Sequence, residues 1–200
     1  MKGLTNIILG LLFLIIITIC ISFLINLPIN NETLLTEDYK SSDEIKWDHM
    51  PITYRYIDTS EFVSTCKEYI KERINKAFNE ITNATKGIVS FKRLNEQESG
   101  EDITINCSNK VEVQNAEVGT STAGLAGPTL IGNKIIHGQI TFYPYQNCGT
   151  YPDTELHEIL HVFGFGHNET NRLSLMYPTI LKCDGKFDND IKEELIRIYG

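Results

Sequence analysis

The stretch that decides the fold covers residues 157–167 and reads HEILHVFGFGH. On an α-helix, which turns about 100° per residue, His157 and His161 lie one turn apart on the same face. Glu158 is displaced around the helix from both imidazoles. Gly164 can adopt the left-handed conformation that ends a helix, so the chain can turn and bring His167 back beside the other histidines. The spacing therefore predicts a helix with three histidines gathered at its C-terminal end.

Three imidazoles gathered in this way are suitable ligands for one zinc ion. Three neutral nitrogens leave a fourth position open for water, which is typical of a catalytic rather than a structural zinc site. Glu158 lies beside that position, where it can take a proton as the zinc-bound water attacks a carbonyl and then deliver it to the leaving amine. We therefore predict one catalytic Zn²⁺ ion held by His157, His161 and His167, with Glu158 as the catalytic residue.

The pattern continues beyond the third histidine, because residues 174–178 read SLMYP. Together with the histidine motif, this segment resembles the metzincin zinc metalloproteases, and among them the matrixins (peptidase M10-type catalytic domains). The resemblance implies that Met176 lies in a turn beneath the zinc and supports the site. Weaker similarity to the family's first strand, to the loop before its edge strand, to the edge strand itself and to its last helix lies in residues 52–55, 123–128, 138–142 and 188–200.

This resemblance implies an α+β fold, a metzincin-like zincin catalytic domain with a twisted mixed sheet of about five strands and three helices. In that family the edge strand binds an extended peptide by β-augmentation. The role would fall here to Gly138, Gln139, Ile140, Thr141 and Phe142. The implied function is a zinc-dependent endopeptidase acting on extracytoplasmic protein or peptide substrates, the extracellular matrix among them. The alternative is a zinc-containing peptide-binding module without proteolytic activity.

Many matrixins hold further metal ions through His and Asp residues in the loop before the active helix. Residues 118–152 contain no Asp or Glu and a single histidine, His137, so we expect these additional sites to be absent. His137 is then interpreted as a histidine on a strand surface, and His49 as structural or without a role.

Hydrophobic periodicity gives a coarse layout that agrees with this fold. Strands are expected at 47–57, 87–94, 102–107 and 135–143, and helices at 60–82, from 153 onward and at 188–199. Residues 115–133 are rich in glycine and poor in periodicity, which indicates a long loop.

The N-terminus carries an apolar run, Ile7–Ile25, without a charged residue. As a helix it would span roughly 28 Å, close to the hydrocarbon core of a bilayer. Lys2 precedes the run and acidic residues follow it, so the positive-inside rule sends the rest of the chain across the membrane. We predict a transmembrane signal anchor at 1–28, a polar tether at 29–46 and the catalytic domain at 47–200, on the extracytoplasmic side. Secretion after signal cleavage is the alternative.

Cysteine content agrees with export, because four cysteines follow the apolar run, an even number suited to two disulfides in an oxidising compartment. Four cysteines allow three pairings. We hypothesise Cys66–Cys107 and Cys148–Cys183.

Length and charge limit the remaining possibilities. The 200 residues have room for one compact domain and a short appendage, and we expect a monomer. Lys and Arg number 18 against 26 Asp and Glu, a net charge of -8, without a basic cluster. This balance argues against a nucleic acid as partner, because phosphate binding needs clustered cations.

Overall fold

A computed structural model describes residues 45–57, 64–95, 97–108, 123–143, 150–179 and 186–200, with side chains of the first described helix from residue 71 onward. The predicted signal anchor and the tether up to residue 44 lie outside these ranges. Within the described ranges, none of the helices combines the length and apolar character that crossing a membrane requires.

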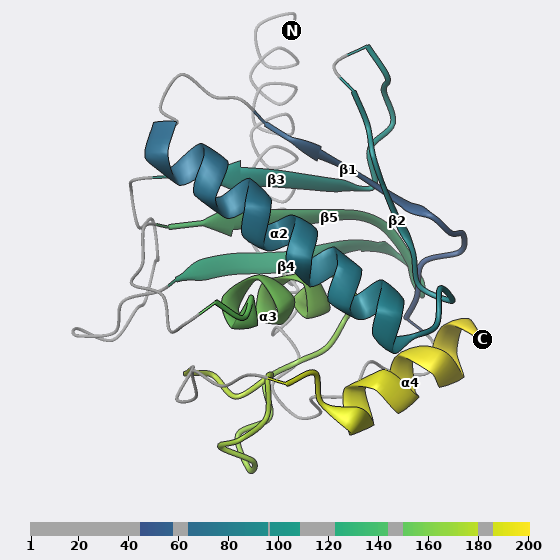
Figure 1. Ribbon diagram of the computed structural model, residues 1–200. Helices are drawn as coiled ribbons and strands as arrows, with labels where there is room; N and C mark the ends of the chain where they lie inside the picture. The colour runs from purple at the N-terminus through teal and green to yellow at the C-terminus, as the bar shows by residue number, and fades with distance from the viewer. Residues whose placement is uncertain (1–44, 58–63, 96, 109–122, 144–149, 180–185) are drawn as a thin grey trace, which may run out of the picture. The chain divides into compact units, whose positions relative to one another are not determined.

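The centre of the domain is a five-stranded mixed sheet (Figure 1). Its strands are β1 (Ile52–Tyr56), β2 (Phe91–Arg93), β3 (Ile103–Cys107), β4 (Gly124–Ile131) and β5 (Lys134–Phe142). The strand order is β2-β1-β3-β5-β4. All neighbouring strands are parallel except β4, which runs antiparallel to β5. The mixed α+β sheet implied by the resemblance is therefore confirmed.

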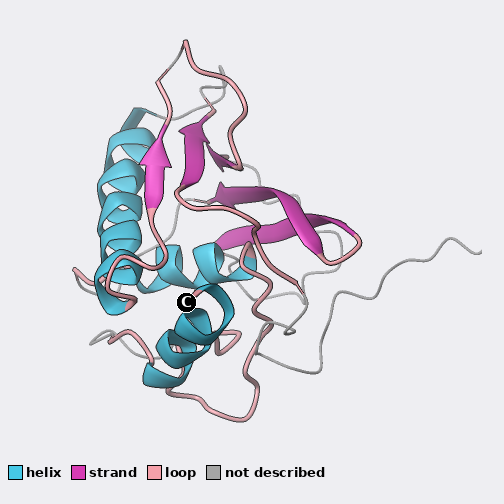
Figure 2. Ribbon diagram, turned by 90° about the vertical axis from the view of Figure 1, so that its right-hand side faces the viewer, coloured by secondary structure: helices cyan, strands magenta, loops and turns pink. Residues whose placement is uncertain are grey.

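Three helices complete the described fold: α2 (Ser64–Ala84), α3 (Asp153–His161) and α4 (Asn189–Tyr199). In the view of Figure 2, the long helix stands beside the strands and the two shorter helices lie at its lower end. α3 packs against both α2 and β4. The helix that carries the histidine motif thus lies between the long helix and one margin of the sheet.

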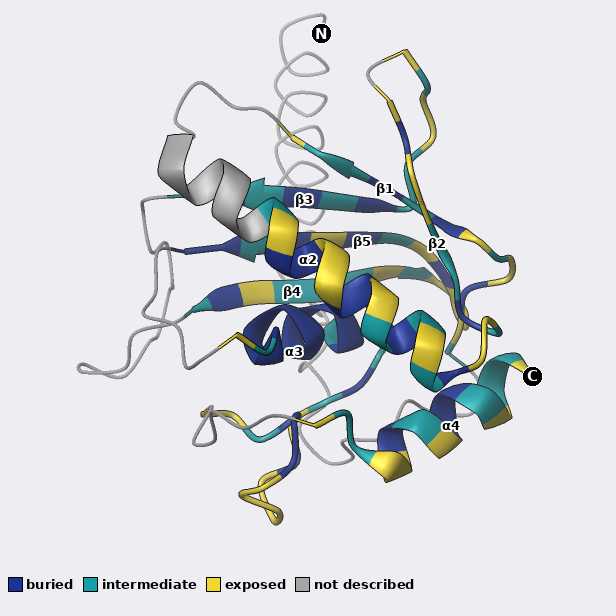
Figure 3. Ribbon diagram, in the orientation of Figure 1, coloured by how far each residue is buried: buried dark blue, intermediate teal, exposed yellow. Residues whose placement is uncertain are grey.

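The core forms between the sheet and the helices, and its residues follow the expected periods. In β3 burial alternates along the strand, with Ile103 and Ile105 buried. In α2 the buried side chains recur every three or four residues, and the opposite face is exposed (Figure 3). The apolar ones among these α2 side chains are Ile74, Ala77, Phe78 and Ile81.

The region expected to be a loop contains strand β4, so that expectation is wrong for residues 124–131. β4 and β5 form a hairpin joined by Gly132 and Asn133, with Gly132 at a φ of 58°. Gly-Asn is a common two-residue hairpin turn, because such turns need a positive φ. The proline in the strand, Pro128, is tolerated because β4 pairs on one side only within the described part of the chain.

The edge-strand position expected for Gly138, Gln139, Ile140, Thr141 and Phe142 is also wrong. These residues lie in β5, which pairs with β3 on one side and β4 on the other. Their backbone hydrogen-bonding groups pair with neighbouring strands on both sides, so these groups are not available to a peptide. The edge strand beside the histidine helix is β4.

One of the predicted disulfide cysteines is described with its side chain. Cys107, at the end of β3, is buried and takes part in a disulfide bond. The side chain of Cys66, and all of Cys148 and Cys183, lie outside the description, so both pairings stay predictions.

Candidate metal centre

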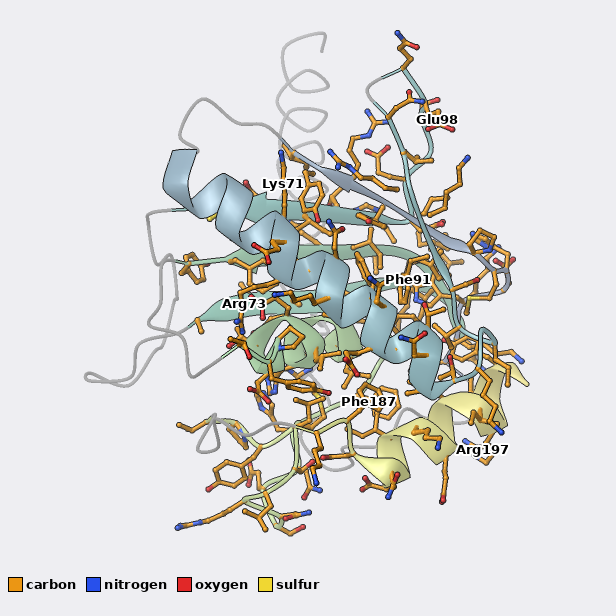
Figure 4. The ribbon with its side chains drawn as sticks, viewed as in Figure 1. Lys71, Arg73, Phe91, Glu98, Phe187 and Arg197 are labelled. Atoms are coloured by element: carbon orange, nitrogen blue, oxygen red, sulfur yellow. The ribbon has the colours of Figure 1, made fainter. Side chains whose placement is uncertain are left out.

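The helix that carries the histidines, α3, is buried and is fixed by an ion pair with α2. The side chains of residues 153–160 in α3 are all buried. Arg73 reaches from α2 toward α3 (Figure 4), and its Nε donates to Oε1 of Glu155 at 2.8 Å. Arg73 Nη2 also donates to the carbonyl oxygen of Tyr151, at 2.7 Å. This buried ion pair fixes the first turn of α3 against the long helix.

The end of α3 turns as the sequence predicts. Gly164 adopts a φ of 84°, the left-handed conformation that a residue with a Cβ rarely takes. The Phe165 N–H then donates to the carbonyl oxygen of Leu160 at 3.1 Å, which closes the helix end. The prediction for Gly164 is confirmed, and the chain continues from this turn to His167.

The three histidines meet through their Nε2 atoms. Nε2 of His157 lies 3.0 Å from Nε2 of His161 and 3.3 Å from Nε2 of His167. Their ligand atoms all lie within 4.8 Å of one another. His157 is buried, His161 half-buried and His167 exposed, so the cluster extends from the interior to the surface.

The outer ring nitrogens are held by backbone carbonyls. Nδ1 of His157 lies 2.8 Å from the carbonyl oxygen of Leu175, and Nδ1 of His161 lies 2.8 Å from that of Phe165. A carbonyl only accepts hydrogen bonds, so each Nδ1 carries the proton and donates it. In the neutral ring, Nε2 is then an unprotonated acceptor, which is the form that binds metal.

Burial favours these neutral rings. It lowers the pKa of His157 to about 3, with a smaller contribution from His161, and lowers the pKa of His161 to about 4. Partial burial of the ring also lowers the pKa of His167. At neutral pH all three imidazoles are therefore available as ligands.

A zinc ion fits this arrangement. Two bare acceptor nitrogens at 3.0 Å repel each other unless a cation lies between them. Nitrogens about 2.0–2.1 Å from a tetrahedral zinc would be separated by about 3.3–3.4 Å, close to the two distances from Nε2 of His157. Three neutral imidazoles are also the donor set of a catalytic zinc site.

Glu158 follows His157 in α3, and its carboxyl group is buried. Burial raises its pKa to about 8, and the negative charge of Glu155 adds to the effect. A divalent cation at the histidines would oppose this shift and favour the carboxylate. The Glu158 side chain passes so close to β4 that a Cβ atom on Gly124 would lie 2.6 Å from its carboxyl carbon and from Oε1.

Hydrogen bonds join the segment that contains Met176 to His157 and to the residue that follows His167. Met176 is fully buried, and its carbonyl oxygen accepts a hydrogen bond from the Asn168 N–H at 2.8 Å, directly after His167. The preceding carbonyl, that of Leu175, orients His157. Asp188 accepts hydrogen bonds from the Ser174 hydroxyl and the Leu175 N–H, both at 2.8 Å, and so anchors the turn to the start of α4.

The other two histidines have different surroundings. Nε2 of His137 on β5 lies 3.1 Å from the hydroxyl oxygen of Thr104 on β3, which agrees with its interpretation as a strand histidine. His49 lies between Asp48 and Asp102, at 2.9 and 3.0 Å.

Some contributors to the site were not found from the sequence. Gly124 was assigned to a loop, although the Gly132-Asn133 turn could have revealed the hairpin that contains it. The Arg73–Glu155 pair joins residues far apart in the chain, and sequence periodicity carries no signal for such a partner. The same holds for the Leu175 carbonyl group that orients His157, 18 residues away in the chain.

Taken together, the geometry shows three histidines that could hold one metal ion, on a mixed α+β domain whose histidine helix also carries a buried glutamate. The family model of the matrixins, peptidase family M10, matches residues 46–200. The chain therefore belongs to the matrixin family of zinc-dependent metallopeptidases. A comparison with curated protein sequences finds no significant match.

Proposed function

We propose that this matrixin is a zinc-dependent endopeptidase that hydrolyses peptide bonds of protein or peptide substrates outside the cytoplasm. The observation that carries the proposal is the convergence of three histidine Nε2 atoms at the C-terminal end of the helix that also carries the buried Glu158 carboxyl. When bound, zinc supplies Lewis-acid activation of the scissile carbonyl and of the attacking water.

The residues of the chain would divide the remaining work among them. His157, His161 and His167 hold the ion, and the Leu175 and Phe165 carbonyls keep the first two rings in the ligating tautomer. Glu158 takes a proton from the attacking water and returns it to the nitrogen of the leaving amine. Met176 supports the site from the turn to which His157 is hydrogen-bonded through Leu175.

Substrate binding falls to β4 in this proposal. An extended peptide can pair with the outer side of this strand, because an edge strand offers backbone N–H and C=O groups to a partner. Gly124 at the start of β4 packs against Glu158, so a peptide along this strand would run close to the general base. Backbone pairing gives affinity with little demand on substrate sequence.

The decisive experiment incubates the zinc-loaded full chain with a mixed peptide library, with and without a zinc chelator. Glu158→Gln is compared with Glu193→Gln, which makes the same chemical change at an exposed position on α4. We expect chelator-sensitive cleavage that persists in Glu193→Gln and is nearly abolished in Glu158→Gln. One zinc bound per chain without cleavage of any peptide would reject the endopeptidase and favour the peptide-binding module.

We also propose that residues 1–28 anchor the protein in the membrane, with the catalytic domain on the extracytoplasmic side. The apolar run and the charges around it support this placement. Alkaline extraction of membranes and protease protection test it. Release into the soluble fraction with a shortened N-terminus would instead support secretion after signal cleavage.

A further inference from the structure

The close contact between β4 and α3 has a consequence for the active site. Gly124 is buried, and it pairs with Phe142 at the first position of the edge strand. A Cβ atom there would lie 2.6 Å from Cδ and Oε1 of Glu158 and 2.7 Å from its Cγ. These distances are far inside van der Waals contact, so any side chain at residue 124 would compete with Glu158 for the same space.

The contact involves the reactive end of Glu158 and the methylene group next to it. Glu158 is itself buried, with α3 packed against β4, so its side chain has little room to retreat. Gly127 on the same strand differs, because a Cβ atom there would meet no heavy atom within 4 Å. The requirement for a missing side chain is therefore specific to residue 124 and does not extend to every glycine of β4.

We propose that Gly124 is a positioning residue for Glu158: the missing side chain at the start of β4 gives the general base its place beside the metal centre. This inference rests on the proposed role of Glu158 in peptide hydrolysis. It adds a second function for β4, which would both pair with the substrate and shape the space that holds the proton-transferring group.

The test compares Gly124→Ala with Gly127→Ala, two identical changes on one strand. In the zinc-loaded Gly124→Ala variant we expect one zinc per chain, the three imidazoles in place and a displaced Glu158 carboxyl in the crystal structure. The kcat for peptide cleavage falls by about 100-fold, because a displacement of about 1 Å has such an effect on proton transfer. The KM stays close to that of the wild type, since alanine preserves the backbone that pairs with the substrate. In Gly127→Ala the Glu158 carboxyl stays in place.

A double-mutant cycle with Glu158→Asp shows whether the effect passes through Glu158. Aspartate withdraws the carboxyl by one methylene, so Gly124→Ala has a much smaller effect on kcat in that background. An equal loss in both backgrounds, or an undisplaced Glu158 carboxyl in Gly124→Ala, overturns the inference. If Gly124→Ala does not fold, Gly124→Ala/Glu158→Ala removes the colliding atoms and folds; failure of that variant as well overturns the inference.

The crystallographic result separates this inference from the proposed function. If the wild-type chain cleaves no peptide, the proposed function fails, while the position of the Glu158 carboxyl in Gly124→Ala still decides whether residue 124 sets it. If the wild type cleaves peptides and Gly124→Ala cleaves them with an unchanged kcat, the positioning role alone is rejected.

Discussion

His157 and His167 each contribute an Nε2 atom to the cluster, but His157 is buried and His167 is exposed. His157 is buried and donates a hydrogen bond to Leu175, so it connects α3 to the turn that carries Met176. His167 is exposed and follows the left-handed turn at Gly164. A ligand at the surface can be removed without opening the core, whereas removal of the buried one leaves a cavity.

The first prediction follows from this difference. His167→Ala is expected to weaken zinc binding by more than about 100-fold, beyond the effect typical of outer-shell residues. The metal-free variant should keep the free energy of unfolding of the metal-free wild type. His157→Ala should weaken zinc binding and also destabilise the metal-free domain. Competition with a chromophoric chelator and urea denaturation measure the two effects, and an equal loss of stability in both variants would contradict this assignment.

At the scale of elements, α3 depends on two contacts with neighbouring elements. The Arg73–Glu155 pair holds it to α2, and both side chains are buried. On the other side, Gly138 of β5 packs against the residue that follows α3, because a Cβ atom at Gly138 would lie 2.9 Å from Cβ of Val162. Neither contact involves the metal ligands directly, but both determine where the helix lies.

Removing one partner of the ion pair should be strongly destabilising. Arg73→Met leaves the Glu155 charge in the interior and is expected to cost about 3–5 kcal/mol of unfolding free energy. The double variant Arg73→Met/Glu155→Leu removes both charges and should recover much of that loss. Urea denaturation of the single and double variants is the measurement. A double variant less stable than Arg73→Met would show that the charges act independently.

The contact at Gly138 gives a further prediction. Gly138→Ala should destabilise the domain by about 1–3 kcal/mol, because the new methyl group overpacks the junction of β5 and Val162. Gly127→Ala serves as the reference, since its methyl group meets no atom within 4 Å. Thermal unfolding of both variants measures the difference in stability. Equal stability of the two variants would contradict the prediction and would mean that Val162 moves away at no cost.

At the scale of the whole molecule, the sequence predicts local patterns well and distant pairings poorly. The histidine helix, its left-handed end and the α2 periodicity depend on residues a few positions apart, and the structure has them where the pattern indicates. The edge strand was misassigned because Gly127 and Pro128 obscure the alternation of β4, while β5 reads as a regular strand whether it is central or peripheral. Strand order follows from packing between segments far apart in the chain.

The segment before β1 is attached to β3 by a charged cluster with a defined pH response. His49 lies between Asp48 and Asp102, and Lys134 pairs with Asp48 on its other side. The hydrogen bond with Asp48, and then that with Asp102, raises the pKa of His49. A raised pKa in the folded state stabilises the protein below the unfolded value of about 6.5 and loses this effect as the pH rises through the folded value.

His49→Gln should therefore destabilise the protein more at about pH 6 than at about pH 8. The difference is small because His49 is half exposed and the charges are screened. Urea denaturation of the wild type and the variant at low ionic strength measures it. A larger destabilisation at the higher pH would have the wrong sign for this cluster.

In the proposed function, one zinc ion at the three histidines serves peptide cleavage. The most direct measurement removes metal from the full chain by dialysis against a chelator and then titrates zinc while peptide cleavage is followed. We expect no cleavage without metal and a rate that rises linearly until one equivalent of zinc per chain is bound. Cleavage that persists in the metal-free protein, or that needs a second equivalent of zinc, would contradict it.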